Sequence, residues 1–139
     1  MVARDIETTL LPLAAAHDIS TLSYSSLALG LLAGTTGPER TFSGDDHRKD
    51  NPRFSSANRE KVARLMEAIA PVAAAHGATK AQVVIAWTLA QPGITFALCG
   101  ARTAQQAREN AGAGRLQMST EDVATISAAV TTHLTDLDA

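Results

Sequence analysis

Only two segments of this 139-residue chain have the length and apolar or β-branched content of a strand: residues 19–24, which favour a buried strand, and residues 94–99. Helical or loop-like sequence surrounds and separates them. Strands separated by helices favour a parallel sheet in an α/β protein. Two strands form a single parallel pair, whereas such sheets normally have several strands covered by helices. The sequence therefore predicts part of a larger α/β fold.

Helical periodicity predicts a helix over residues 4–16 and another over residues 58–76. In the second helix Asn58 is the expected N-cap, Pro71 should kink or stop the helix, and Gly77 should end it. The apolar face expected for the first helix consists of Ile6, Leu10, Leu13 and Ala14.

Three further helices are predicted from capping-box patterns. Thr79 with Gln82 opens a helix that reaches about Ala90, and Thr103 with Gln106 opens one that reaches about Ala113. Ser119 with Asp122 opens the last helix, whose apolar face carries Val123, Ile126 and Val130.

Composition excludes several classes of function. Hydrophobic residues make up 45% of the chain and charged residues 19%, as in globular proteins. A net charge of -2 gives no basic excess for nucleic acid. No apolar run reaches the roughly 18 residues of a membrane span, and the start lacks the apolar stretch of a signal peptide. Cys99 has no partner for an internal disulfide. We expect a cytoplasmic protein, with no nucleic-acid partner, membrane or metal site.

A long, glycine- and proline-containing loop is predicted over residues 25–57. Its first part, from Tyr24 to Gly34, leaves a predicted strand with a backbone suited to cradling phosphate, and the Tyr24 ring could stack on a planar group. An ordinary surface loop with a half-buried tyrosine is the alternative. The later run from Asp45 to Asp50 is expected to be solvated charge.

A second candidate site follows the other strand. Gly100 and Arg102 precede a capped helix start, where free N–H groups and the guanidinium favour an anion. Gln106, Glu109 and Asn110 share one face of that helix and would suit an adenine. An ordinary solvated helix face is the alternative. Parallel strands bring both candidate segments to one end of a sheet, where α/β proteins bind ligands.

Four segments resemble, in order, the motifs of the aldo-keto reductases. Tyr24 to Gly34 resembles Y-S-P-L-x-x-G-L-L-x-G, and Asn51 to Phe54 resembles N-P-R-F. Cys99 to Thr103 resembles P-G-x-R-[ST], and Glu109 to Gly112 resembles E-N-x-G. The resemblance extends from the helix before the seventh barrel strand to near the C-terminus. It implies a partial (β/α)8 TIM barrel, formed by residues 1–139 as the last two parallel strands with their helices.

The resemblance also implies binding of NADP(H), which these enzymes use to reduce aldehydes and ketones. Tyr24 would stack on the nicotinamide, while Ser25, Leu27 and the Gly30 loop would approach the pyrophosphate. Gly100, Arg102 and Gln106 would hold the 2′-phosphate and ribose, and Glu109 with Asn110 would meet the adenine. Ser26 and Cys99 depart from the pattern, because each replaces a proline.

The resemblance leaves the catalytic residues unassigned. The family's Asp, Tyr, Lys and His come from its first four strands, and this chain resembles only the part after the sixth. Tyr24 is the single tyrosine. Four histidines lie outside strand ends, at His17, His47, His76 and His133.

The leading hypothesis is therefore the C-terminal portion of an NADP(H)-dependent oxidoreductase. A carbonyl substrate would bind only after completion by an N-terminal half. Met1 falls near the expected end of the sixth strand, so a truncated or mis-started gene product would have this form. The alternatives are an inactive nucleotide-binding or interaction fragment and one piece of a split enzyme. Exposed sheet edges lead us to expect self-association.

Overall fold

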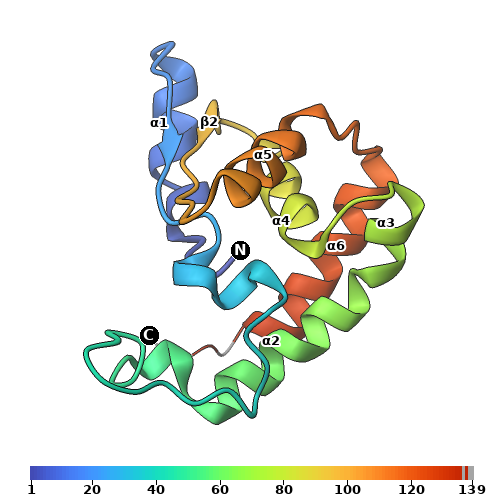
Figure 1. Cartoon of the computed structure of the whole chain (residues 1–139). Coiled ribbons are helices and arrows are strands. Elements are labelled where there is room, and N and C mark those ends of the chain that lie inside the picture. The colour runs from blue at the N-terminus through green and yellow to red at the C-terminus, as the bar shows by residue number, and fades with distance from the viewer. Residues whose placement is uncertain (136, 138–139) are drawn as a thin grey trace.

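The computed structural model describes residues 1–135 and residue 137, and its element order follows the prediction (Figure 1). Helices separate the two strands, as in an α/β protein, and four short 3-10 helices (η) fill connections within the described residues. The elements are η1 Asp5–Glu7, α1 Leu10–Ala16, β1 Leu22–Ser23, η2 Ala28–Ala33, η3 Pro52–Phe54, α2 Ser56–Ala68, α3 Ala70–Ala75, α4 Lys80–Leu89, β2 Phe96–Ala97, α5 Ala104–Gly112, η4 Ala113–Arg115 and α6 Thr120–Leu134.

The two strands pair in parallel, which confirms the predicted sheet. Leu22 aligns with Phe96, and the Phe96 N–H donates to the Thr21 carbonyl at 2.9 Å. Both strands are shorter than predicted. The expectation that the first strand is buried is wrong, because Leu22 is 58% exposed; Phe96 in the second strand is 57% exposed. No further strand covers the pair within the described residues.

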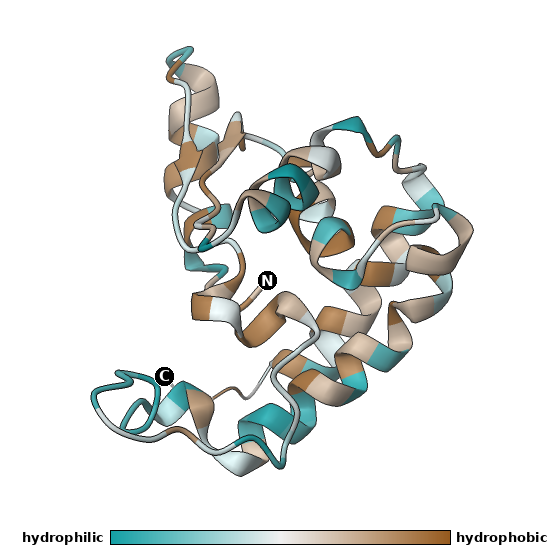
Figure 2. Ribbon diagram, in the orientation of Figure 1, coloured by the Kyte–Doolittle hydropathy of each residue, from teal (hydrophilic) through white to brown (hydrophobic). Residues whose placement is uncertain are grey.

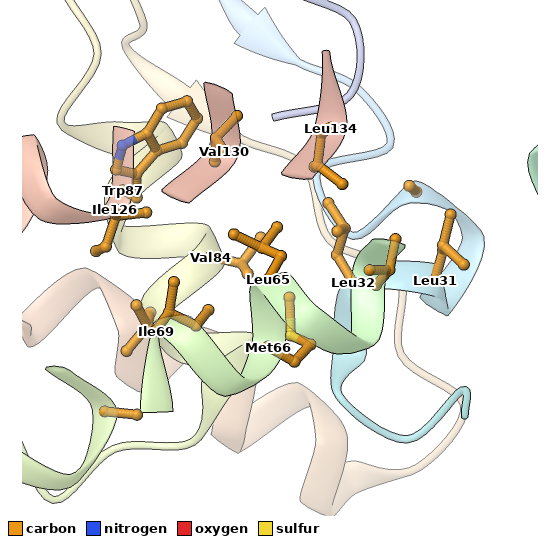
Figure 3. Packing of buried hydrophobic residues seen from close by; sticks show 14 of the residues in the cluster. Leu31, Leu32, Leu65, Met66, Ile69, Val84, Trp87, Ile126, Val130 and Leu134 are labelled. Carbon is orange, nitrogen blue, oxygen red and sulfur yellow. The ribbon is translucent and has the colours of Figure 1, made fainter. Parts of the chain in front are cut away.

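Most of the core lies among the helices rather than on the sheet. Helices α2 and α6 pack side by side, and α4 lies beside them (Figure 1). Leu65, Ile69 and Ile126 are fully buried between these helices (Figure 3). The Trp87 indole N–H donates to Ser127 Oγ at 3.0 Å and so joins α4 to α6.

Helix α2 begins earlier than predicted. Its N-cap is Ser55, whose hydroxyl accepts from the Asn58 N–H at 3.3 Å, so the prediction of Asn58 as the cap is wrong. Asn58 is buried instead, and its amide donates to the Pro52 carbonyl at 3.1 Å. The predicted break near Pro71 is confirmed, because α2 ends and α3 begins around Ile69. Gly77 follows with a φ of 57°.

Two of the three capping boxes are complete as predicted: Thr79 with Gln82, and Ser119 with Asp122. At the third, Thr103 Oγ1 accepts from the Gln106 N–H at 3.1 Å, but Gln106 Oε1 accepts from the Arg102 N–H at 2.8 Å instead. Only the first half of that box forms.

The first predicted helix is divided. Residues 5–7 form η1, and α1 begins at Leu10, because Pro12 is tolerated only in the first turn of a helix. The predicted buried face is largely wrong. Leu11 and Ala14 are buried, whereas Ile6, Leu10 and Leu13 are exposed. No helix within the described residues is long and apolar enough to cross a membrane.

Candidate functional site

Parallel pairing brings the two candidate segments to the same end of the sheet, as predicted. Ser26, three residues after the end of β1, is 7% exposed, and its hydroxyl lies 3.3 Å from the Ser23 carbonyl and 3.5 Å from the Leu98 carbonyl. Burial raises the pKa of the Cys99 thiol, and a hydrogen bond with Ser26 partly offsets this. The two residues that replace prolines therefore contact each other between the strands.

The loop after β1 holds a strained backbone. Ser25, Ala28 and Leu29 have φ angles of 58°, 48° and 56°, which side chains disfavour, and Gly30 follows at 89°. The Ala28 N–H donates to the Ser25 carbonyl at 2.7 Å, and the Gly30 N–H donates to Leu27 at 2.9 Å. Left-handed backbone outside glycine concentrates at ligand-binding sites, so this loop is a candidate for one.

The side chains of the first segment differ in what they offer a ligand. The Tyr24 ring is 81% exposed at the strand end, so the alternative of a half-buried core tyrosine is wrong. Leu27 packs against the hydrophobic core, which leaves its backbone as the part able to face a ligand. An open cavity of about 340 Å³ lies beside this loop, lined by Tyr24, Ser25, Leu29, Asn51, Arg53 and Phe54.

In the second segment, side chains of α5 brace the loop that precedes it. Besides the Gln106 contact with the Arg102 N–H, Asn110 Nδ2 donates to the Gly100 carbonyl at 3.2 Å. Gly100, Arg102 and Gln106 are exposed, and Glu109 is half-buried. The Arg102 guanidinium thus stands at a helix N-terminus on an ordered loop.

Two residues of the charge run, Asp46 and Arg48, lie near the candidate site, which the sequence did not predict. Asp46 and Arg48 form an ion pair with an Nη2–Oδ2 distance of 2.5 Å, and the Arg48 side chain is only 13% exposed. The Arg48 side-chain hydrogen bond holds the pKa of Asp46 well below its usual range, and Arg102 lowers it slightly further. A Cβ at Gly30 would lie 4.0 Å from Arg48 Nη1.

This pair therefore lies near both candidate segments. The expectation of a wholly solvated run was wrong for Asp46 and Arg48, although the other four residues of the run are exposed. The feature of the sequence that could have indicated this ion pair is an Asp two residues before an Arg. Among the described residues there is no cluster of three or more side chains suited to a metal ion.

The model of the Aldo/keto reductase family matches residues 1–131. The chain belongs to this family. It is 30% identical over 122 residues to aldo-keto reductase str7 of Strobilurus tenacellus, covering 88% of this chain and 36% of that protein. It is 36% identical over 100 residues to aldo-keto reductase YhdN of Bacillus subtilis, covering 71% and 30%. The aldo/keto reductase chain thus spans about a third of the length of these relatives.

A solved structure confirms the fold class. The glycerol dehydrogenase AKR11B4 from Gluconobacter oxydans superposes with a TM-score of 0.86 at 28% identity, covering 98% of this chain and 42% of that chain. The α/β fold is that of part of an aldo/keto reductase barrel. Family membership implies a nicotinamide cofactor.

Proposed function

We propose that residues 1–139 are the C-terminal, cofactor-binding part of an NADP(H)-dependent oxidoreductase that reduces a carbonyl to an alcohol. One observation carries the proposal. Parallel pairing of β1 and β2 sets the strained loop after Tyr24 beside the arginine-bearing start of α5. The ends of parallel strands are where α/β proteins bind ligands, and both segments offer groups suited to phosphate.

The residues present fit a dinucleotide. The exposed Tyr24 ring offers a face for the nicotinamide, and the positive-φ loop of Ser25, Leu27 and Gly30 would take the pyrophosphate. At the other end, Gly100, Arg102 and Gln106 would hold the ribose and its 2′-phosphate. Glu109 and Asn110 would contact the adenine.

In this proposal the chain's own residues bind the cofactor and orient it. When bound, the nicotinamide supplies or accepts the hydride. Reduction of a carbonyl also needs a positioned proton donor. Tyr24 is the single tyrosine and is placed at the cofactor, so we assign no catalytic residue within this chain. The donor and the carbonyl substrate would bind with an N-terminal half.

The exposed sheet favours a second candidate function. Leu22 and Phe96 are more than half exposed, as expected for a pair of strands that another polypeptide covers. One piece of a split enzyme would have this property. An inactive nucleotide-binding or interaction fragment would have it too. A preference for NADP⁺ over NAD⁺ tests the nucleotide-binding site itself, which a split enzyme and a nucleotide-binding fragment would share with the leading proposal.

The test is titration of the purified chain with NADP⁺ and NAD⁺ by calorimetry at low salt. A charge-assisted contact from Arg102 to the 2′-phosphate contributes about 1.5–3 kcal/mol. Because Arg102 is exposed, solvent and salt will screen much of it. We expect weak binding with a preference for NADP⁺ of about tenfold or less.

Arg102→Ala should abolish the preference for NADP⁺ over NAD⁺, and Asn110→Ala should lower the affinity for both cofactors alike. Arg64→Ala is the matched control, because Arg64 is an exposed arginine on α2 and should leave both affinities unchanged. Equal affinity for the two cofactors, or no effect of Arg102→Ala, would contradict the assigned site.

A further inference from the structure

Gly112, the last residue of the E-N-x-G motif, has no backbone reason to be glycine. Its φ of -59° is ordinary helix, which any residue adopts. The space around it is the reason. A Cβ added at Gly112 would lie 2.6 Å from Gln82 Nε2, which is closer than non-bonded atoms approach. The glycine therefore leaves room for the amide of Gln82.

The Gln82 amide joins two helices. Its Oε1 accepts from the Thr79 N–H at 2.9 Å and completes the capping box of α4. Its Nε2 donates to the Glu109 carbonyl of α5, also at 2.9 Å. One half-buried side chain thus caps α4 and holds α5 against it.

The Glu109 carbonyl is open to this contact because α5 tightens at its end. In a continuing α-helix this carbonyl would accept from the N–H four residues later, at Ala113. The Ala113 N–H instead bonds the Asn110 and Ala111 carbonyls, where α5 passes into η4. A carbonyl at a helix end needs another donor, and Gln82 supplies it.

We propose that Gln82 and Gly112 are positioning residues that fix α5, and through it the loop at residues 100–102, relative to the core. Helix α4 is almost entirely buried and so provides a firm base. From α5, the side chains of Gln106 and Asn110 hold the Arg102 N–H and the Gly100 carbonyl. The packing part of this proposal stands alone. The part that concerns cofactor binding rests on the proposed function.

A double-mutant cycle tests the packing. Gly112→Ala should lower the urea midpoint of the otherwise unchanged chain, because the new methyl displaces the Gln82 amide. In a Gln82→Ala background the same change should be neutral or stabilising, since alanine is the better helix former. An equal effect of Gly112→Ala on the urea midpoint in both backgrounds would show that Gly112 does not make room for the Gln82 amide.

Gln82→Glu tests positioning. The carboxylate keeps the acceptor of the capping box, which favours Glu or Gln, but it cannot donate to the Glu109 carbonyl. We expect faster amide hydrogen exchange over residues 100–112 with little change in α2, and NADP⁺ affinity several-fold weaker under conditions where the chain is fully folded. Ser119→Ala, which removes a cap on α6, should lower stability without either effect.

The outcomes separate the two proposals. Unchanged exchange at residues 100–112 in Gln82→Glu would overturn the positioning role, whatever the affinity. Failure of the unsubstituted chain to bind NADP⁺ would contradict the proposed function, while the exchange and the double-mutant cycle would still decide the roles of Gln82 and Gly112.

Discussion

Ser25, Ala28 and Leu29 hold backbone conformations that cost free energy without being glycine, asparagine or aspartate. Nothing in their side chains predicts a positive φ, so the sequence indicated a Gly-containing loop but not its strain. By contrast, the cap from the Thr103 hydroxyl to the Gln106 N–H was predicted, since it depends on residues three apart. The contact of Gln106 with the Arg102 N–H, which replaces the second half of the predicted capping box, was not. Nor was the contact of Ser26 with Cys99, because it exists only once β1 and β2 pair.

The strain at Leu29 should be measurable. A left-handed residue costs roughly 1–2 kcal/mol, and glycine loses about 0.5–1 kcal/mol more conformational entropy on folding. Leu29 is 57% exposed, so Leu29→Gly removes little buried surface. We expect a gain in stability of up to about 1 kcal/mol in urea unfolding.

Leu13→Gly is the matched control for that substitution. Leu13 is similarly exposed, at 55%, but lies in α1 with a helical backbone. Glycine there should cost about 1 kcal/mol through helix propensity. The two substitutions should have opposite signs, and a loss of stability in both would show that Leu29 is not strained.

Helix boundaries marked by a capping box, Pro71 or Gly77 were the most readily predicted from the sequence, since capping is local, whereas the start of α2 was misplaced at Asn58. Both complete capping boxes, the break before Pro71 and the turn at Gly77 are confirmed. The buried face of α1 was wrong because periodicity alone does not show which neighbour a helix has. Only tertiary contacts distinguish Leu11, which is buried, from Leu10, which is not.

Helices α3 and α6 are joined by a pH-dependent contact. His76 Nε2 lies 3.0 Å from Asp122 Oδ2, and Asp122 also accepts from the Ser119 N–H and hydroxyl. Hydrogen bonds from the Ser119 side chain and backbone, followed by that from His76, lower the pKa of Asp122. A carboxyl whose pKa is lower in the folded state stabilises the fold above its unfolded pKa of about 3.9.

We therefore expect the chain to lose stability as the pH falls from about 5 through the lowered folded pKa of Asp122. Asp122→Asn keeps an acceptor for Ser119 but does not titrate, so it should reduce the slope of urea midpoint against pH in this range. Asp45→Asn is the control, because Asp45 is exposed. An unchanged slope in Asp122→Asn would contradict the assignment.

At the scale of the molecule, most of the apolar residues that fail to reach the core lie in α1 or in and next to the two strands. Figure 2 shows apolar ribbon in α1. These apolar residues are exposed by 40% or more and comprise Ile6, Leu10, Leu13, Ile19, Leu22, Tyr24, Leu29, Phe96 and Leu98. The sequence predicted strands, parallel pairing and a partial fold with exposed sheet edges, but it marked the first strand as buried. An apolar segment indicates a surface that is stable when buried, but nothing in the described residues buries these strands.

The proposed function leads to a prediction about activity. We expect the isolated chain to show no NADPH-dependent reduction of an aldehyde such as 4-nitrobenzaldehyde, because general acid–base catalysis contributes about 10²–10⁴-fold and no proton donor is assigned here. The measurement is NADPH absorbance after purification that removes host reductases. Turnover that co-purifies with the chain and is lost in Tyr24→Phe would contradict this and would identify Tyr24 as the donor.

The last prediction concerns association of the isolated chain through its exposed sheet. Unpaired strand edges invite pairing with another chain, and burial of apolar surface contributes about 25 cal/mol per Å². Leu22 and Phe96 lie opposite each other in the register, and both are more than half exposed. We expect oligomers in sedimentation velocity, binding of a hydrophobic dye, and a broad thermal transition.

Leu22→Lys with Phe96→Lys should shift the distribution toward monomer, because charges on strand edges oppose pairing. Thr125→Lys with Ala128→Lys adds the same charge on exposed positions of α6 and should leave the oligomers unchanged, which separates the effect of the sheet from that of net charge. A monodisperse monomer with a sharp cooperative melt would show that the chain tolerates its open sheet alone.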